Sequence, residues 1–176
     1  MHLFKSPFLK LSISLVGFIL IFSNITQAAE KRDLIGSFRD WDAFMITKDS
    51  VEKVCYMVSV PKDTTPKNVR RGEIYITITH RPNVRVFNEI NIVAGYPFKE
   101  GSEATATIGG KKYTMFTEGD GAWRRTPRED TEMVEAMRVG NDLQMRGISG
   151  RGTNTSDRYS LLGFTAAHNA ITEACQ

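Results

Sequence analysis

The clearest pattern in the chain is a period of two in hydrophobicity. Across residues 73–80, the run EIYITITH places isoleucines at alternate positions, with tyrosine and threonine between them. Residues 84–93, VRVFNEINIV, continue this alternation after the turn-forming triplet Arg81-Pro82-Asn83. Period two with β-branched residues is typical of strands, so the two runs predict an antiparallel hairpin.

Shorter runs of the same kind lie on both sides of this hairpin. Gly109-Gly110 separates two of them and has the permissive backbone that a tight turn needs. The segment 61–72, PKDTTPKNVRRG, contains two prolines and four basic residues and predicts an exposed loop. We predict further strands over residues 34–47 (centred on Trp41), 54–60, 103–108, 112–117, 122–126, 143–148 and 158–162.

Two segments have helical spacing. Asp130 is predicted to cap a helix over 131–139, and Gly140 is predicted to end it in a left-handed conformation. A second helix is predicted over 165–174, capped by Thr165; since about ten residues form a marginal helix in water, it depends on packing against the sheet. These elements predict a mainly β single domain, a β-sandwich or barrel-like fold with a short internal helix and a C-terminal helix.

The N-terminus predicts a secretory signal peptide. Lys5 and Lys10 precede an apolar core over 11–22, and small residues follow it. Cleavage is expected after Ala28 or, alternatively, after Ala29, which leaves a mature domain over 29–176. The apolar core is shorter than the roughly 20 residues that a membrane span requires, so we expect no stable membrane span after cleavage.

The two cysteines of the chain are Cys55 and Cys175. In an exported protein an even number of cysteines favours disulfide formation, and these two allow one pairing within the chain. A catalytic redox pair would instead have C-x-x-C spacing. We therefore predict a structural disulfide between Cys55 and Cys175.

The mature chain is close to neutral. The full sequence has 23 Lys and Arg against 20 Asp and Glu, and removal of Lys5 and Lys10 with the signal peptide lowers the formal net charge from +3 to +1. Proteins that bind nucleic acids usually carry a clear basic excess, so we expect no nucleic-acid partner.

Patterns for catalysis or metal binding are weak. His80 and His168 are far apart in the sequence, whereas metal ligands usually lie at close spacing. Gly147-Ile148-Ser149-Gly150 is followed by Arg151 and does not complete a G-x-S-x-G nucleophile elbow. Gly150-Arg151-Gly152 is only a fragment of a dinucleotide-binding loop and precedes a strand instead of opening a helix. We interpret both runs as ordinary glycine turns. Helix capping and solvation explain the carboxylates between residues 118 and 132. We therefore predict no catalytic residue, no metal site and no cofactor.

The best candidate for an interaction surface is a basic cluster beside a tryptophan, since Arg and Trp are enriched at interface hot spots. The alternative is a solvated strand end with Trp123 in the core. The cluster consists of Trp123, Arg124, Arg125 and Arg128, and Lys67, Arg70 and Arg71 are candidates to extend it.

Several blocks, in this order, carry a resemblance to a known family: FRDWDAF around Trp41, KVCYMVSVPK around Cys55, RRGEIYITITHRP, GYPFKEGSEATATIGGKKYTMF, GDGAW ending at Trp123, and RGTNTSDRYSLLGFTAA before Cys175. On these blocks the chain resembles the invasion-associated locus B family of exported bacterial proteins. Many relatives have a cysteine a few residues after the tryptophan that corresponds to Trp41, and this chain has none there.

The resemblance implies a β-sandwich with a C-terminal helix and, in some members, a link to entry into host cells. It also implies location in the periplasm or outer envelope of a Gram-negative bacterium, and it supplies no catalytic residue to carry over. We expect a non-enzymatic interaction protein that is periplasmic, outer-membrane-associated or secreted. Its partner is an unknown envelope or host-surface protein or glycan. The alternatives are a stress-related protein that stabilises the envelope and an enzyme that modifies an envelope polymer.

Overall fold

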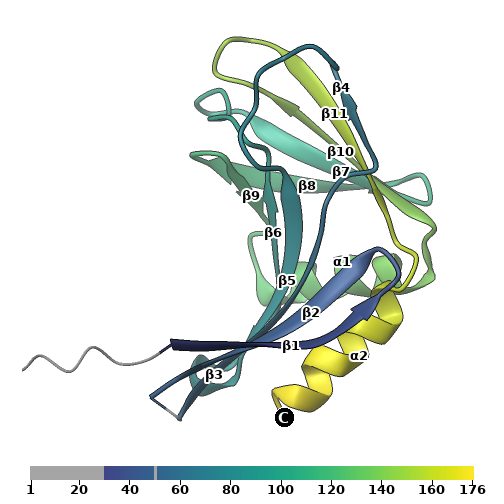
Figure 1. Ribbon diagram of the computed structural model, residues 1–176. Coiled ribbons are helices and arrows are strands. Elements are labelled where there is room, and N and C mark those ends of the chain that lie inside the picture. The colour runs from purple at the N-terminus through teal and green to yellow at the C-terminus, as the bar shows by residue number, and fades with distance from the viewer. Residues whose placement is uncertain (1–29, 50) are drawn as a thin grey trace, which may run out of the picture.

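The computed structural model describes residues 30–49 and 51–176, and the predicted signal peptide lies outside the described residues. The described chain forms one antiparallel sheet of eleven strands, two α-helices and one short 3₁₀-helix (Figure 1). The strands are β1 (Glu30–Phe38), β2 (Trp41–Lys48), β3 (Glu52–Ser59), β4 (Asp63–Thr65), β5 (Tyr75–Arg81), β6 (Val86–Val93), β7 (Glu103–Ile108), β8 (Lys111–Glu118), β9 (Gly121–Trp123), β10 (Asp142–Ile148) and β11 (Asn154–Ser160). The helices are η1 (Pro82–Val84), α1 (Pro127–Val139) and α2 (Phe164–Ala174).

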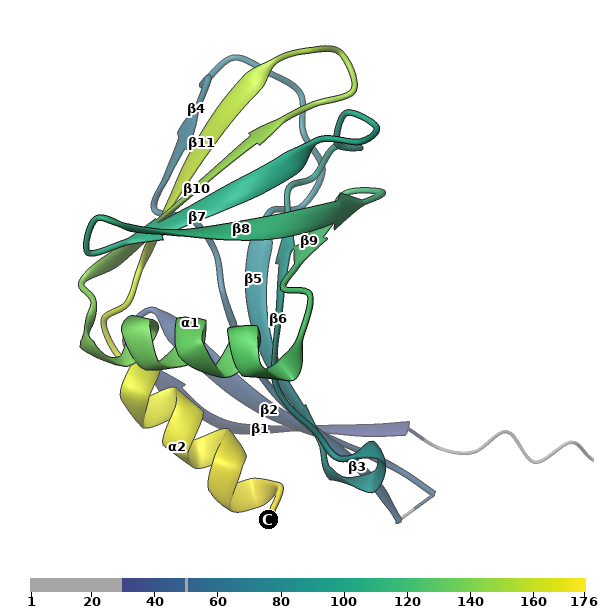
Figure 2. The same ribbon diagram turned by 180° about the vertical axis from the view of Figure 1, so that it is seen from behind.

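The sheet is strongly curved. The strand order is β1-β2-β3-β5-β6-β9-β8-β7-β10-β11-β4, and β5 and β6 run between the two ends of the molecule (Figures 1 and 2). The turn between β1 and β2 contacts the end of β11, where the indole Nε1 of Trp41 donates to the carbonyl of Ser160 at 3.0 Å. The predicted mainly β single domain, sandwich-like or barrel-like with a short internal helix and a C-terminal helix, is confirmed, and its strands form one antiparallel sheet.

Alternation along the strands builds the core. Cys55 and Met57 of β3 and Ile76 and Ile78 of the neighbouring β5 are fully buried on the inner face. Helix α2 packs on β1, β2 and β3, while α1 packs on β6 and touches α2 (Figure 2). Phe164 of α2 meets Trp41 edge-on, with ring centroids 5.1 Å apart. The period-two strands and the apolar helix face therefore bury one shared core.

Several predicted strand boundaries were wrong. The run over 34–47 is two strands, β1 and β2, because the chain reverses at Arg39-Asp40; Arg39 itself takes a left-handed backbone (φ 61°) that usually falls to glycine. The strand predicted over 158–162 is β11, which starts at Asn154, and the one predicted over 122–126 ends at Trp123 as β9. No local glycine or proline marks the Arg39 turn, which explains the merged prediction.

The predicted helix caps were also wrong. The hydroxyl of Thr126 caps α1 by accepting from the amide of Glu129 at 3.3 Å. Asp130 lies inside the helix, where it is buried and accepts from the amide of Ile90 in β6 at 3.0 Å. Gly140 has an ordinary φ of −81°. Helix α2 begins after Gly163 (φ 89°), where the carbonyl of Phe38 leaves no room for a side chain.

Candidate functional site

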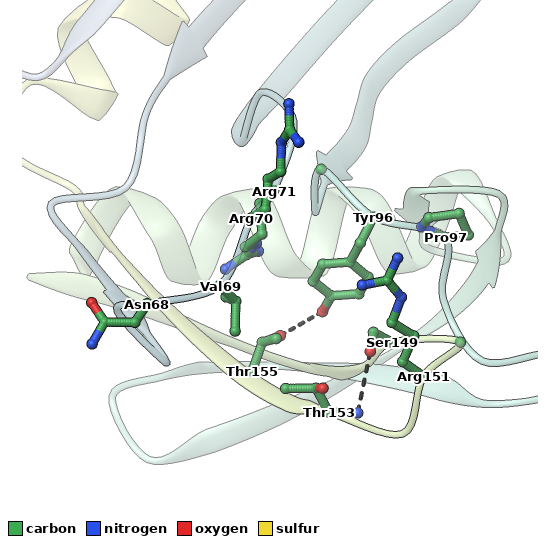
Figure 3. A pocket seen from close by; sticks show the side chains of 12 residues that line it. Asn68, Val69, Arg70, Arg71, Tyr96, Pro97, Ser149, Arg151, Thr153 and Thr155 are labelled. Carbon is green, nitrogen blue, oxygen red and sulfur yellow. Dashed lines mark hydrogen bonds between the residues drawn. The ribbon is translucent and has the colours of Figure 1, made fainter.

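Loops at one end of the molecule line a pocket of about 610 Å³ (Figure 3). One of them is the β10–β11 turn, which lies at the end opposite α2 in Figure 1. Three segments line the pocket: residues 68–71 before β5, residues 95–97 after β6, and residues 149–155 from the β10–β11 turn into β11. We call it the arginine pocket, after Arg70, Arg71 and Arg151 in its lining.

A buried ion pair forms the base of the arginine pocket. The guanidinium of Arg71 donates two hydrogen bonds to the carboxylate of Asp157, at 2.7 and 2.6 Å, and the two side chains are only 5% and 2% exposed. Arg71 also donates to the carbonyl of Ala94 at 2.9 and 2.7 Å. It thus joins the segment before β5 to the end of β6 and to β11. The predicted exposed loop over 61–72 is wrong here, since it contains β4 as well as buried Arg71.

Tyr96 forms one wall of the arginine pocket. The guanidinium carbon of Arg71 lies 4.9 Å from the centre of its ring, and its hydroxyl is hydrogen-bonded to the hydroxyl of Thr155 (Figure 3). Burial raises the pKa of Tyr96, so its hydroxyl stays neutral at physiological pH. Gly95 precedes it at φ 70°, and a side chain there would collide with the carbonyls of Gly72 and Glu73. The contacts with Arg71 and Thr155 hold the ring of Tyr96, and the close packing at Gly95 holds its backbone.

The β10–β11 turn continues this wall beside the Tyr96 segment. The amide of Gly150 donates to the carbonyl of Pro97 at 2.8 Å, which holds this turn against the Tyr96 segment. Within the turn, the amide of Thr153 donates to the hydroxyl oxygen of Ser149 at 3.2 Å, and the amide of Ser149 donates to the carbonyl of Thr153 at 2.9 Å. These bonds preorganise the pocket before any ligand arrives.

The charge of the arginine pocket is uncompensated at its mouth. Asp157 neutralises Arg71 from below, but no carboxylate lines the pocket. Within residues 30–49 and 51–176, neither Arg70 nor Arg151 forms an ion pair with a carboxylate, and both side chains are exposed. This arrangement suits a small anionic ligand that is recognised by charge-assisted hydrogen bonds.

The predicted patch around Trp123 has a different character. Trp123 is half-buried, and its ring stacks on Phe116 with centroids 5.8 Å apart, so it lies neither in the core nor free on the surface. Arg124 is only 10% exposed and donates to the carbonyl of Thr114.

The arginines of this patch face carboxylates. Arg124 lies 3.7 Å from Glu129, Arg125 lies 2.8 Å from Glu103, and Arg128 lies 3.1 Å from Glu132. Lys67, which the sequence suggested as an extension, pairs with Asp63. The patch stays a prediction, but its positive charge is locally matched.

The two histidines, which are far apart in the sequence, lie together where α2 packs on the sheet: His168 is on the buried face of α2, and His80 is in β5. Their ring centroids are 5.4 Å apart, and Asn88 links them. The backbone N–H of Asn88 donates to Nδ1 of His80 at 3.0 Å. Its side-chain oxygen is hydrogen-bonded to Nε2 of His168 at 2.7 Å. Arg138 lies 2.9 Å from Nδ1 of His168, which requires a neutral imidazole with its proton on Nε2. Burial, with Arg138 and His80 adding to it, lowers the pKa of His168 to about 4.

In the described part of the chain, no three His, Cys, Asp or Glu residues lie close enough together to hold a metal ion. The predicted disulfide is present, joining Cys55 of β3 to Cys175 at the end of α2. It ties the C-terminal helix to the sheet across a sequence separation of 120 residues.

Comparison with protein families decides the relationship. The family model described as invasion associated locus B (IalB) protein matches residues 41–172. The chain belongs to this family. The matched region of this IalB-family chain includes all three segments of the arginine pocket and Cys55, while Cys175 follows it.

The other comparisons add no relative of the IalB-family chain: no curated protein and no solved structure matches it. Among the described residues, no helix has the length and apolarity needed to cross a membrane.

Proposed function

We propose that this chain is an exported, non-enzymatic binding protein of the Gram-negative cell envelope that contributes to host-cell invasion through the arginine pocket. In this proposal it acts in the periplasm, at the outer membrane or outside the cell. The observation that carries the proposal is the pocket itself: two exposed arginines without carboxylate partners stand over a rigid, buried base. Family membership supports the link to invasion.

A binding role fits the way this site is built. The charged and polar groups of its base are already satisfied by one another, as Arg71 is by Asp157 and Ala94. Such groups hold geometry and do not exchange protons, whereas catalytic acids and bases usually titrate near the working pH. The disulfide between Cys55 and Cys175 supports export, since disulfides persist in oxidising compartments.

The test compares two pairs of arginines in the source bacterium. A strain that lacks the gene is complemented with the wild type, with Arg70→Gln/Arg151→Gln, or with Arg125→Gln/Arg128→Gln as a control of equal charge loss. We expect the pocket variant to associate with host cells as poorly as the deletion strain, and the control to behave as the wild type. Cell fractionation and mass spectrometry of the N-terminus check export and cleavage after residue 28 or 29.

Three results would contradict the proposal. A deletion strain that associates with host cells as well as the wild type would remove the role in invasion. Protein recovered from the cytoplasm with residues 1–28 intact would remove export. Loss of association in the Arg125/Arg128 control alone would move the site to the patch around Trp123.

A further inference from the structure

The charged groups of the arginine pocket indicate an anionic ligand. Arg70 and Arg151 come from different segments and lie on either side of Tyr96 in Figure 3. With no carboxylate in the lining, an anionic group in the pocket can accept charge-assisted hydrogen bonds from these exposed guanidinium groups. Arg71 is already engaged by Asp157, so it stabilises the base and leaves recognition to the two exposed arginines.

The uncharged lining indicates that the rest of the ligand is amphipathic. The ring of Tyr96 and the side chains of Pro97 and Val69 supply apolar surface. Beside them, the hydroxyl oxygen of Ser149 accepts from the amide of Thr153 and keeps its own proton for another acceptor. Asn68 adds a side-chain amide on the other wall. A ligand that fits this lining presents carbon–hydrogen surface and hydroxyl groups together.

A sugar ring combines these properties. One face of its ring is apolar enough to lie on an aromatic side chain, and its hydroxyls project around the rim toward donors and acceptors. The volume of about 610 Å³ falls within the roughly 300–1,000 Å³ range of small-molecule sites. We propose that the arginine pocket binds a saccharide unit that carries a carboxylate or phosphate group. This inference rests on the proposed binding function and names the class of ligand.

An acidic peptide is the competing ligand, and the lining favours it less. Peptides are recognised along sheet edges, in long apolar grooves or by arginine clusters on a surface. The arginine pocket is instead a compact site between loops, and two of these loops are fixed side by side, since Gly150 donates to Pro97 at 2.8 Å. The peptide therefore enters the test as a contradicting outcome.

The experiment measures binding of defined probes to the mature, disulfide-bonded protein by calorimetry and by NMR. The probes are glucuronic acid, glucose 6-phosphate, glucose, inorganic phosphate and N-acetyl-glutamate amide. We expect one or both acidic sugars to bind about tenfold or more tightly than glucose, phosphate or the peptide mimic, because charge and ring are recognised together. Bound sugar should shift the NMR signals of Tyr96 and Ser149 and be recovered chemically unchanged.

Variants locate the site. Arg70→Gln/Arg151→Gln should weaken binding of the acidic sugar about tenfold or more and leave the melting temperature unchanged, since both side chains are exposed. Arg125→Gln/Arg128→Gln removes the same charge and should bind as the wild type does. Equal binding by both double variants would overturn the assignment to this pocket.

The outcomes separate this inference from the proposed function. Binding of inorganic phosphate or of the peptide mimic as tight as that of the acidic sugars would overturn the saccharide class. If no acidic sugar binds but the pocket variant still loses host-cell association, the ligand class fails and the binding function stands. A sugar that is recovered altered would instead contradict a non-enzymatic role.

Discussion

The two ends of the molecule bury polar groups in different ways. At the pocket end, Arg71 and Asp157 are both charged and satisfy each other with two hydrogen bonds. At the helix end, His80 of β5 packs against His168 of α2, and burial lowers the pKa of both imidazoles. A covalent bond, Cys55–Cys175, closes the helix end, whereas the pocket end is held by hydrogen bonds and the ion pair.

This difference has a physical consequence for function. Removing one partner of a buried ion pair lowers the free energy of unfolding by several kcal/mol, because the other charge stays buried without compensation. A neutral buried imidazole is indifferent to salt but is destabilised by acid. The pocket end should therefore be sensitive to loss of one charged partner, and the helix end to reductant and low pH.

The largest effect is expected from opening the disulfide. Cys175→Ser should lower the free energy of unfolding by about 4 to 5 kcal/mol in the chain-entropy model, because the bridge closes a loop of 120 residues. Hydrogen exchange should speed up in α2 more than in β10 and β11, since the bond holds the helix end. Melting with and without reductant, together with mass spectrometry of free thiols, checks this; coincident melts would contradict it.

The second effect is expected from breaking the ion pair under the arginine pocket. Arg71→Met should destabilise the fold by about 3 to 5 kcal/mol, because Asp157 is left buried and unpaired. The matched control is Arg71→Met/Asp157→Leu, which removes both charges and should recover most of the loss. Denaturant unfolding of the two variants gives the comparison, and equal instability of both would show that packing, rather than charge, holds this end.

Local pattern predicted much of the fold. The β5–β6 hairpin follows from alternation, and Gly109 and Gly110 take φ values of 55° and 83° at the predicted turn between β7 and β8. Both helices were placed within a few residues of their bounds, although their caps were not. Asp130 shows why: its carboxylate serves an amide on a distant strand, and a capping rule considers only neighbours in sequence.

The candidate site could not be assembled from the sequence. Arg71 and Asp157 are 86 residues apart, and no local pattern indicates that they pair. The sequence did single out Arg70 and Arg71 but grouped them with the arginines around Trp123, and Arg151 was assigned to an ordinary glycine turn. Residues 68–71 follow β4, and residues 149–155 lead from β10 into β11. These two segments come to one end of the molecule only because β10, β11 and β4 are neighbours in this order in the sheet. The contact between His80 and His168 likewise could not be predicted from the sequence, because the fold alone brings them together.

The smallest effect concerns pH at the helix end, where two buried groups act in opposite directions. His168 has a folded-state pKa of about 4 against 6.5 when unfolded, so its stabilising contribution is complete above pH 6.5 and is lost as pH falls toward 4. Burial raises the pKa of Asp130 to about 6 from 3.8, so its contribution grows as pH falls through the same range. Each effect amounts to about 3 kcal/mol and offsets most of the other.

Separate variants expose the two contributions. In unfolding experiments between pH 7 and 4, His168→Gln should lose less stability on acidification than the wild type, because Gln has no proton to gain. Asp130→Asn should lose more, because the compensating uptake at Asp130 is gone. His80, whose pKa burial also lowers, adds to the acid loss in every variant that retains it. If both variants follow the wild-type pH profile, the buried groups of the helix end do not control acid stability, and its contrast with the pocket end reduces to the disulfide.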